Sequence, residues 1–160
     1  MDYVDRVRRY LEDRGLPGRV LEFDVSSATV ELAARALHCQ CGMIAKTLSF
    51  MAGDRPVLIV MAGDARTDNR RYKDQFGCKA RMMTEEELRE HTGLAFGGVC
   101  PFDLPPSVEL YLDESLLRHE VIYPAAGSPS SAVRMTPGEL ESVVPHKGWI
   151  RVSRDMDTNT

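Results

Sequence analysis

The feature that most constrains the fold is a pair of neighbouring segments, 43–50 and 56–62, joined by a short polar turn. In the first segment, larger apolar residues alternate with small or polar ones, which is typical of a strand with two different faces. The second segment, PVLIVMA, is apolar throughout, as expected for a strand buried on both faces. The turn AGDR is of hairpin length. We therefore expect a hairpin near the centre of a sheet.

Helices and further strands are expected around this hairpin. Their spacing mixes hairpin-length and helical connections without strict alternation of strand and helix. The pattern predicts a mixed α/β fold with a mixed, mainly antiparallel sheet surrounded by helices. Apolar periodicity and capping residues indicate helices over 2–14, 30–38, 68–76, 85–91 and 137–144. Alternation indicates shorter strands over 21–25, 78–83, 108–112 and 121–123.

Length and composition favour a single globular domain. The 160 residues include 43% hydrophobic and 28% charged positions, which fits one soluble domain over 1–152 with a polar tail over 153–160. The sequence has no apolar run long enough to cross a membrane, and its charged start lacks a secretory core, so we expect a cytoplasmic location. The net charge of −4 argues against extensive nucleic-acid binding.

One stretch, 66–81, concentrates positive charge in this otherwise acidic chain. It offers candidate contacts to the backbone of a short tRNA end. A solvated helix face is the alternative explanation. The candidate tRNA-binding residues are Arg66, Arg70, Arg71 and Lys73, with Lys79 and Arg81 following.

Cysteine and histidine spacing does not predict a metal site. Cys39 and Cys41 form a C-x-C pair that lacks the usual zinc spacing, and Cys78 and Cys100 stand alone. Without an export signal these cysteines are expected to be reduced thiols. The histidines show neither metal nor catalytic-triad spacing, and no dinucleotide or P-loop motif is present. We expect no metal and no cofactor.

Lys46 is the most informative single residue. It lies on the apolar face of segment 43–50, between Ile44 and Leu48. Lysine is rarely buried without a partner, so an ammonium on an inward face needs an anion or an opening. Lys46 therefore either holds an anionic ligand or extends along the sheet to a solvated edge. The residues alone leave both interpretations open.

Two glycine-containing segments are candidate ligand-binding loops. In the first, adjacent glycines permit a close backbone approach and a proline stiffens the exit. Such a loop can direct backbone N–H groups at a carbonyl or an oxyanion. A plain turn is the alternative for each segment. The candidates are Gly97, Gly98, Val99, Cys100 and Pro101 in the first, and Ala126, Gly127 and Ser128 in the second.

These features recur in a fixed order along roughly residues 3–145. A strand lysine followed by a G-x-x-x-P loop at this separation is the most specific part. The pattern resembles the YbaK/aminoacyl-tRNA-synthetase-associated family, the editing domain inserted in many bacterial prolyl-tRNA synthetases and also found free-standing. The matching residues are Ala45-Lys46-Thr47-Leu48, Gly63-Asp64-Ala65-Arg66-Thr67-Asp68, Glu86-Glu87-Leu88, Thr92-Gly93, Gly97 to Phe102, Ala126-Gly127 and Thr136-Pro137-Gly138-Glu139-Leu140.

The resemblance implies a partly barrel-like mixed sheet and an editing deacylase that acts without a metal. Its substrate would be a mischarged tRNA, most of all tRNA(Pro) carrying a small amino acid such as Cys or Ala. Lys46 would hold the terminal adenosine and its phosphate, and the segment 97–101 would position the aminoacyl carbonyl. Beside the tRNA acceptor end, prolyl-tRNA synthetase and a second copy in a homodimer are the partners considered.

Two departures from the family pattern concern the accepted amino acid. The segment 128–133 lacks a histidine that some members carry, and Cys100 stands where serine or threonine is frequent. The activated ester needs no Ser-His-Asp set, because placement and oxyanion stabilisation supply much of the rate. The alternatives to an enzyme are a non-catalytic module that binds an amino acid or an aminoacyl-tRNA, and a structural accessory domain.

Overall fold

The computed structural model describes residues 2–156, and its centre is a five-stranded sheet of order β6-β2-β3-β5-β8. The predicted hairpin is confirmed, since β2 and β3 pair antiparallel in the middle of this sheet. The other neighbouring pairs in it are parallel, so the predicted mixed sheet is confirmed as well. The strands are β2 (Ile44–Ala52), β3 (Arg55–Ala62), β5 (Glu109–Asp113), β6 (Tyr123–Pro124) and β8 (Trp149–Ile150).

Two small antiparallel sheets flank the central one. β1 (Val20–Glu22) pairs with β7 (Ser131–Val133), and β4 (Ala65–Thr67) pairs with β9 (Ser153–Asp155). A single antiparallel bridge between Ile122 and Met135 continues the hydrogen bonding from the β6 edge toward β7. The sheet system therefore extends around one side of the molecule beyond its five main strands.

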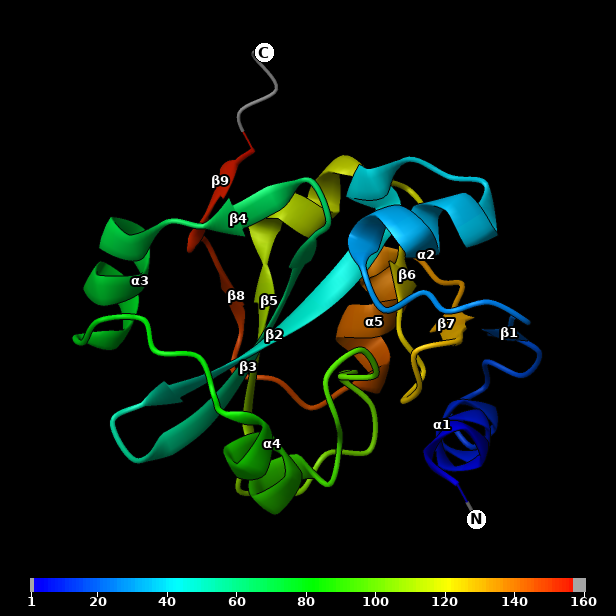
Figure 1. The fold of residues 1–160 in the computed structure, drawn as a ribbon, viewed down its shortest axis with the longest axis horizontal. Coiled ribbons are helices and arrows are strands. Elements are labelled where there is room, and N and C mark those ends of the chain that lie inside the picture. The colour runs from blue at the N-terminus through cyan, green and yellow to red at the C-terminus, as the bar shows by residue number, and fades with distance from the viewer. Residues whose placement is uncertain (1, 157–160) are drawn as a thin grey trace.

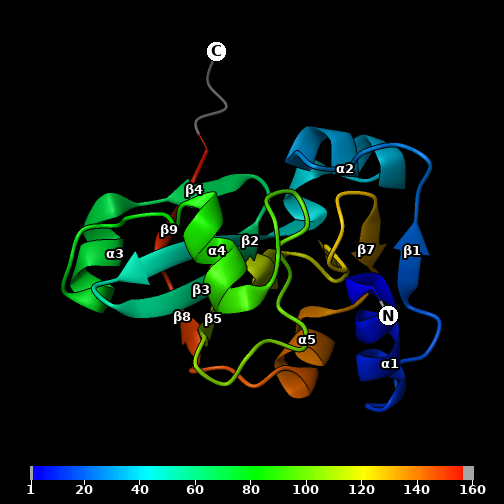
Figure 2. The same cartoon turned by 60° about the horizontal axis from the view of Figure 1, so that its bottom comes forward.

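Residues 2–156 form five α-helices. Figures 1 and 2 show how the helices surround the sheets. Their ends follow the expected capping chemistry: Thr84 with Glu87 and Thr136 with Glu139 form complete capping boxes. Figure 2 shows α1 and α5 together at the lower right, and α4 in front of β3. The helices are α1 (Tyr3–Glu12), α2 (Val30–Leu37), α3 (Asn69–Phe76), α4 (Glu85–Thr92) and α5 (Pro137–Val143), with short 3-10 turns at Cys41–Met43 and Glu114–Arg118.

The wholly apolar sequence of β3 is explained by burial on both of its faces. Leu58 and Val60 point into the larger core, which also contains residues of α1, α4 and α5. Val57, Ile59 and Met61 point into a second core that contains Tyr72 of α3. All five β3 side chains in these two sets are fully buried. Alternating residues of one strand thus join the two cores.

The expected strand over 78–83 is wrong. This segment makes only an isolated bridge between Phe50 and Met82, with hydrogen bonds from the Met51 amide to the Arg81 carbonyl (2.9 Å) and from the Met83 amide to the Ser49 carbonyl (3.0 Å). The chain leaves β2 at Thr84, which caps α4, so the pairing is too short for a strand. The expected strands over 21–25 and 121–123 occur as the shorter β1 and β6.

The C-terminal segment contributes a strand before the end of the described chain. Of the expected polar tail, 153–155 forms β9, where Ser153 is buried and donates to the Asp113 carboxylate at 2.6 Å. Residues 157–160 lie outside the described part of the chain.

Candidate functional site

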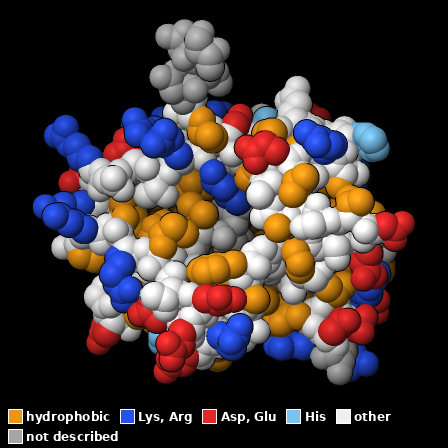
Figure 3. Space-filling view, in the orientation of Figure 1, with side chains coloured by type: hydrophobic (Ala, Val, Ile, Leu, Met, Phe, Trp, Pro, Cys, Tyr) orange, Lys and Arg blue, Asp and Glu red, His pale blue; other side chains and the backbone are white. Residues whose placement is uncertain are grey.

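A gap in the pairing of β2 forms the pocket that is the candidate site. The outer edge of β2 pairs with β6 at Ile44 and Ala45, and with the segment 81–83 near residues 49–51. Between these contacts, 46–48 has no strand neighbour on that edge within the described chain. A cavity of about 280 Å³ lies beside the gap. Figure 3 shows a hollow near the middle of this face, bordered by hydrophobic side chains.

Segments that are far apart in the sequence close the pocket around this gap. They are 27–30 at the start of α2, Phe96, Gly97 and Val99 at the start of the first glycine segment, and 131–132 in β7. The Ser27 hydroxyl donates to the Pro129 carbonyl at 2.8 Å, and the Ser27 amide donates to the same oxygen. These bonds tie the first wall of the pocket to the loop before β7.

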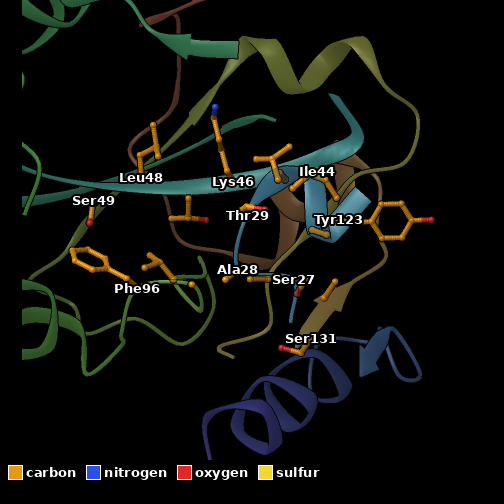
Figure 4. Close-up of a pocket in the computed structure, with 18 of the residues that line it drawn as sticks. Ser27, Ala28, Thr29, Ile44, Lys46, Leu48, Ser49, Phe96, Tyr123 and Ser131 are labelled. Carbon is orange, nitrogen blue, oxygen red and sulfur yellow. The ribbon is translucent and has the colours of Figure 1, made fainter. Parts of the chain in front are cut away.

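Lys46 lines the pocket and places its ammonium beside the start of β4. In Figure 4 its side chain points to the side of β2 opposite Ser49 and Phe96, as strand alternation requires. Its ammonium donates to the carbonyl oxygen of Gly63 at 3.4 Å and to that of Ala65. The alkyl stem lines the pocket, and the residue is half-buried.

The Lys46 charge is not neutralised by a carboxylate within residues 2–156. The nearby Asp64 carboxylate pairs instead with Arg118, at 3.4 Å. Burial lowers the pKa of the Lys46 amino group, while Asp64 and Glu31 act in the opposite direction. Neutral carbonyl oxygens stabilise the ammonium but leave its net charge, which is therefore available to an anionic ligand.

Thr47 directs polar groups into the gap and is a residue that the sequence analysis did not single out. The Ser49 carbonyl and the Met51 amide use the outer edge of β2. Along a strand, the backbone N–H and C=O groups of every second residue face the same edge. Those of Thr47 therefore face the outer edge of β2, as those of Ser49 and Met51 do. Its hydroxyl oxygen is buried and has no hydrogen-bond partner in the described chain. The alternation of residues 43–50, which places Thr47 and Ser49 on one face, was the sequence feature that could have indicated Thr47.

The two glycine segments pack against each other beside the pocket. A Cβ atom on Gly98 would lie 3.0 Å from backbone atoms of Gly127 and Ser128. Gly97 has a φ of +91°, and a Cβ there would lie 3.3 Å from both Ala28 and Pro129. Glycine is therefore required for close backbone approach at 98 and for the left-handed conformation at 97.

The backbone N–H groups of the first glycine segment differ in their availability. The Gly98 amide donates to the Ala95 carbonyl at 3.1 Å. The amides of Gly97 and Val99 donate to no acceptor among residues 2–156. Gly97 and Val99 also line the pocket. These two amides are the better candidates for binding a carbonyl oxygen.

Several of the other expected site residues lie behind the pocket wall. Cys100 and Ala126 are fully buried, and neither Gly98 nor Gly127 lines the cavity. The Cys100 thiol contacts the Phe102 carbonyl at 3.9 Å, and burial raises its pKa to about 12. The Ser128 hydroxyl donates to Ser131, which does line the pocket, at 2.8 Å. Pro101 faces a different cavity.

The expected tRNA-binding residues lie on β4 and α3. Arg66, Arg70 and Lys73 are exposed, whereas the Arg71 guanidinium donates to the Ser153 carbonyl and so holds β9. Arg66 is close enough to Lys46 to lower the pKa of the lysine. Figure 3 shows Lys and Arg side chains gathered over the region where Figure 1 places α3 and β4. The basic stretch thus begins beside the pocket mouth.

Residues 2–156 contain no cluster of three or more side chains of the types that hold metal ions. Among the helices of this range, none combines the length and the apolar character needed to span a bilayer.

Comparisons with known proteins identify relatives over most of the chain. The family model of the aminoacyl-tRNA editing domain matches residues 25–143. The uncharacterized protein YwhH of Bacillus subtilis is 45% identical over 152 residues, covering 94% of this chain and 97% of YwhH. The proline–tRNA ligase of Leuconostoc mesenteroides is 30% identical over 87 residues, which is 54% of this chain but only 15% of the ligase.

Solved structures share the same fold at full length. A protein described as a candidate trans-editing enzyme for prolyl tRNA synthetase matches with a TM-score of 0.81 and 34% identity, covering 92% of this chain and 95% of that one. The hypothetical protein APE2540 matches with a TM-score of 0.83 and 29% identity, covering 93% and 99% of the two chains.

Proposed function

This chain belongs to the family of aminoacyl-tRNA editing domains, and from that premise we propose that it deacylates mischarged tRNA in trans. The proposed substrate is tRNA(Pro) carrying a small amino acid such as cysteine or alanine. The observation that carries the proposal is the pocket at the β2 gap, which is lined by Lys46 and by Gly97 and Val99, whose amides have no acceptor among residues 2–156. The similarity to part of a proline–tRNA ligase and to a candidate trans-editing enzyme for prolyl tRNA synthetase supports the choice of tRNA.

The size of the pocket supports a small aminoacyl group. A cavity of about 280 Å³ lies just below the usual size of ligand pockets, and at its wall Gly97 packs closely against Ala28. In the proposed complex, the ester carbonyl accepts hydrogen bonds from the Gly97 and Val99 amides. The Thr47 hydroxyl binds the amino-acid moiety at the floor of the gap.

The proposed reaction is hydrolysis by a positioned water molecule. Water adds to the ester carbon, and the developing oxyanion is stabilised by the loop amides. The bond between that carbon and the ribose oxygen then breaks, and the ribose hydroxyl leaves with a proton. A free amino acid and an intact tRNA are the products. This route needs no protein nucleophile, in agreement with a Cys100 thiol that burial keeps protonated.

The mouth of the pocket suits the end of a tRNA. Lys46 makes no ion pair among residues 2–156, so its positive charge is proposed to attract a phosphate, and Arg66 on β4 adds a second positive charge nearby. Phe96 and Met82 line the pocket while about half of each side chain is exposed (52% and 51%). An exposed aromatic ring at the edge of the pocket is a suitable surface for stacking a base.

Single-turnover deacylation of a panel of mischarged tRNAs tests the proposal. The panel contains tRNA(Pro) charged with proline, alanine or cysteine, and tRNA(Ala) charged with alanine. We expect rapid hydrolysis of alanyl- or cysteinyl-tRNA(Pro), with prolyl-tRNA(Pro) spared. Saturable binding of these substrates without accelerated hydrolysis would instead identify a non-catalytic binding module, and hydrolysis of every ester equally would exclude an editing role.

A further inference from the structure

A second and larger cavity lies on the other side of the first glycine segment. It has a volume of about 430 Å³ and is bounded by the C-terminal end of α1, the segment after α5 and the loop that follows Pro101. Four proline rings supply much of its apolar lining, and four polar or charged side chains complete it. The prolines are Pro101, Pro105, Pro106 and Pro145, and the polar or charged residues at issue are Arg14, Asp103, His146 and Lys147.

Positive charge prevails at this cavity. The Arg14 guanidinium lies 3.4 Å from the centroid of the Tyr10 ring and donates to the Tyr10 carbonyl at 3.0 Å, so its position is fixed. The backbone amide of Lys147 donates to the Leu110 carbonyl at 2.7 Å, which positions this residue at the cavity. Neither cation has an ion-pair partner among residues 2–156. The Asp103 carboxylate is already paired with Arg6, at 2.9 Å.

His146 adds unsatisfied hydrogen-bonding groups. Both of its ring nitrogens are buried and have no partner within the described chain. A buried polar group without a partner is destabilising, by about 1–3 kcal/mol. A neutral imidazole offers one donor and one acceptor. Because the two nitrogens point in divergent directions from the ring, the edge of a ligand would pair with one of them.

We propose that this cavity is a nucleotide-binding site, separate from the deacylation pocket. The base would pack its flat apolar faces against the proline rings and present its hydrogen-bonding edge to His146. Its phosphate would lie at Arg14 and Lys147. The cavity volume is within the range of small-ligand sites. The nucleotide is either a free mononucleotide or a nucleotide of an RNA strand, and its chemistry is the same in both cases.

The site is physically connected to the deacylation pocket. Val99 lines the first cavity and Pro101 lines the second, while the intervening Cys100 is fully buried between them. A nucleotide against Pro101 therefore contacts the back of the loop that carries the Val99 amide. The binding claim itself does not depend on the proposed deacylase activity.

Titration of the isotope-labelled protein with AMP, followed by backbone amide NMR, tests the site directly. We expect saturable shifts at residues 102–104, 107–110 and 146–147, with adenosine and inorganic phosphate each binding more weakly than AMP. The double variant Arg14→Gln/Lys147→Gln should weaken AMP binding by about tenfold or more. His146→Phe should weaken it as well. Arg9→Gln, which removes an exposed charge from α1, shortly before Arg14 in the chain, is the matched control.

A parallel titration with uncharged tRNA identifies the source of the nucleotide. A loss of AMP affinity with unchanged tRNA affinity assigns the site to a free mononucleotide. Weaker tRNA binding in both the double variant and His146→Phe, but not in Arg9→Gln, assigns it to an RNA nucleotide. The proposal is overturned if neither AMP nor tRNA affinity depends on these residues, or if inorganic phosphate binds as tightly as AMP.

Discussion

At the scale of single residues, Lys46 offers the most direct test of the proposed substrate geometry. Lys46→Ala should lower kcat/KM for deacylation by about 1.5–3 kcal/mol of transition-state binding, because it removes a charge-assisted contact to the tRNA end. The loss of its bonds to the Gly63 and Ala65 carbonyls should change the unfolding free energy by only about 1 kcal/mol. Single-turnover kinetics and urea unfolding separate the effects. Unchanged kinetics would remove Lys46 from the mechanism.

A substitution at Thr47 should also lower activity without lowering stability. Thr47→Val keeps the shape of the side chain but removes a buried hydroxyl that has no partner within the described chain. We expect the unfolding free energy to stay equal or rise by up to about 1 kcal/mol, while kcat/KM falls. The matched control is Thr92→Val, because the Thr92 hydroxyl already donates to the Leu88 carbonyl at 2.6 Å and its loss should destabilise. Equal kcat/KM for wild type and Thr47→Val would contradict the assigned role.

Cys100 tests whether the chemistry uses a protein nucleophile. Its thiol is fully buried, and desolvation raises its pKa to about 12, so the reactive thiolate is suppressed at neutral pH. Cys100→Ala should therefore retain deacylation, and Cys100→Ser should also retain it with some loss of stability from a buried hydroxyl. Mass spectrometry of the quenched reaction checks for an adduct. A dead Cys100→Ala variant, together with a thioester on the wild-type protein, would establish a cysteine mechanism instead.

At the scale of elements, the glycine loop can be tested against an internal control. Gly97 and Gly93 both have positive φ, of +91° and +76°, but only Gly97 has neighbours within 4 Å of a new Cβ. Gly97→Ala and Gly93→Ala should therefore share the backbone strain, about 1 kcal/mol. Only Gly97→Ala should also reduce single-turnover deacylation, since its Cβ crowds Pro129 and also Ala28, which lines the pocket. Equal rates for the two variants would show that the loop tolerates a side chain.

Local sequence signals predicted the elements that depend on local chemistry. The capping boxes at Thr84 and Thr136 fixed the starts of α4 and α5, and alternation with an apolar run fixed the central hairpin. The short strands β4, β8 and β9 have three residues or fewer and pair with partners far along the chain. Nothing within such a segment specifies its partner, so its sequence alone could not identify it.

The candidate site was predictable only in part from the sequence. Lys46, Gly97 and Val99 were expected from sequence and do line one cavity. The gap beside Thr47 was not, because it exists only where the pairing of β6 ends and that of segment 81–83 has not begun. Its position depends on long-range register, which no local pattern in the sequence encodes.

At the scale of the whole molecule, one ion pair joins the region before β1 to the start of α5. The Arg19 guanidinium donates to both carboxylate oxygens of Glu139 at 2.8 Å, and both side chains are about 30% exposed (32% and 28%). These bonds lower the pKa of Glu139 from 4.5 to about 2. The pair connects the two segments that flank the β1–β7 sheet. Protonation of Glu139 should therefore lower the unfolding free energy of the whole domain.

The direction of the resulting pH dependence follows from the lowered pKa. A group whose pKa is lower in the folded state stabilises the fold above its unfolded pKa, and this contribution is lost as pH falls toward the folded value. The Glu139 contribution should thus be complete above pH 4.5 and decline between pH 4.5 and about 2. Arg19→Gln should flatten the fall in unfolding free energy over this window, whereas Arg8→Gln, in the more exposed pair with Glu22, should change it little. Urea unfolding at several pH values measures both. An equal acid loss in wild type and Arg19→Gln would show that other carboxylates control the acid stability of this protein.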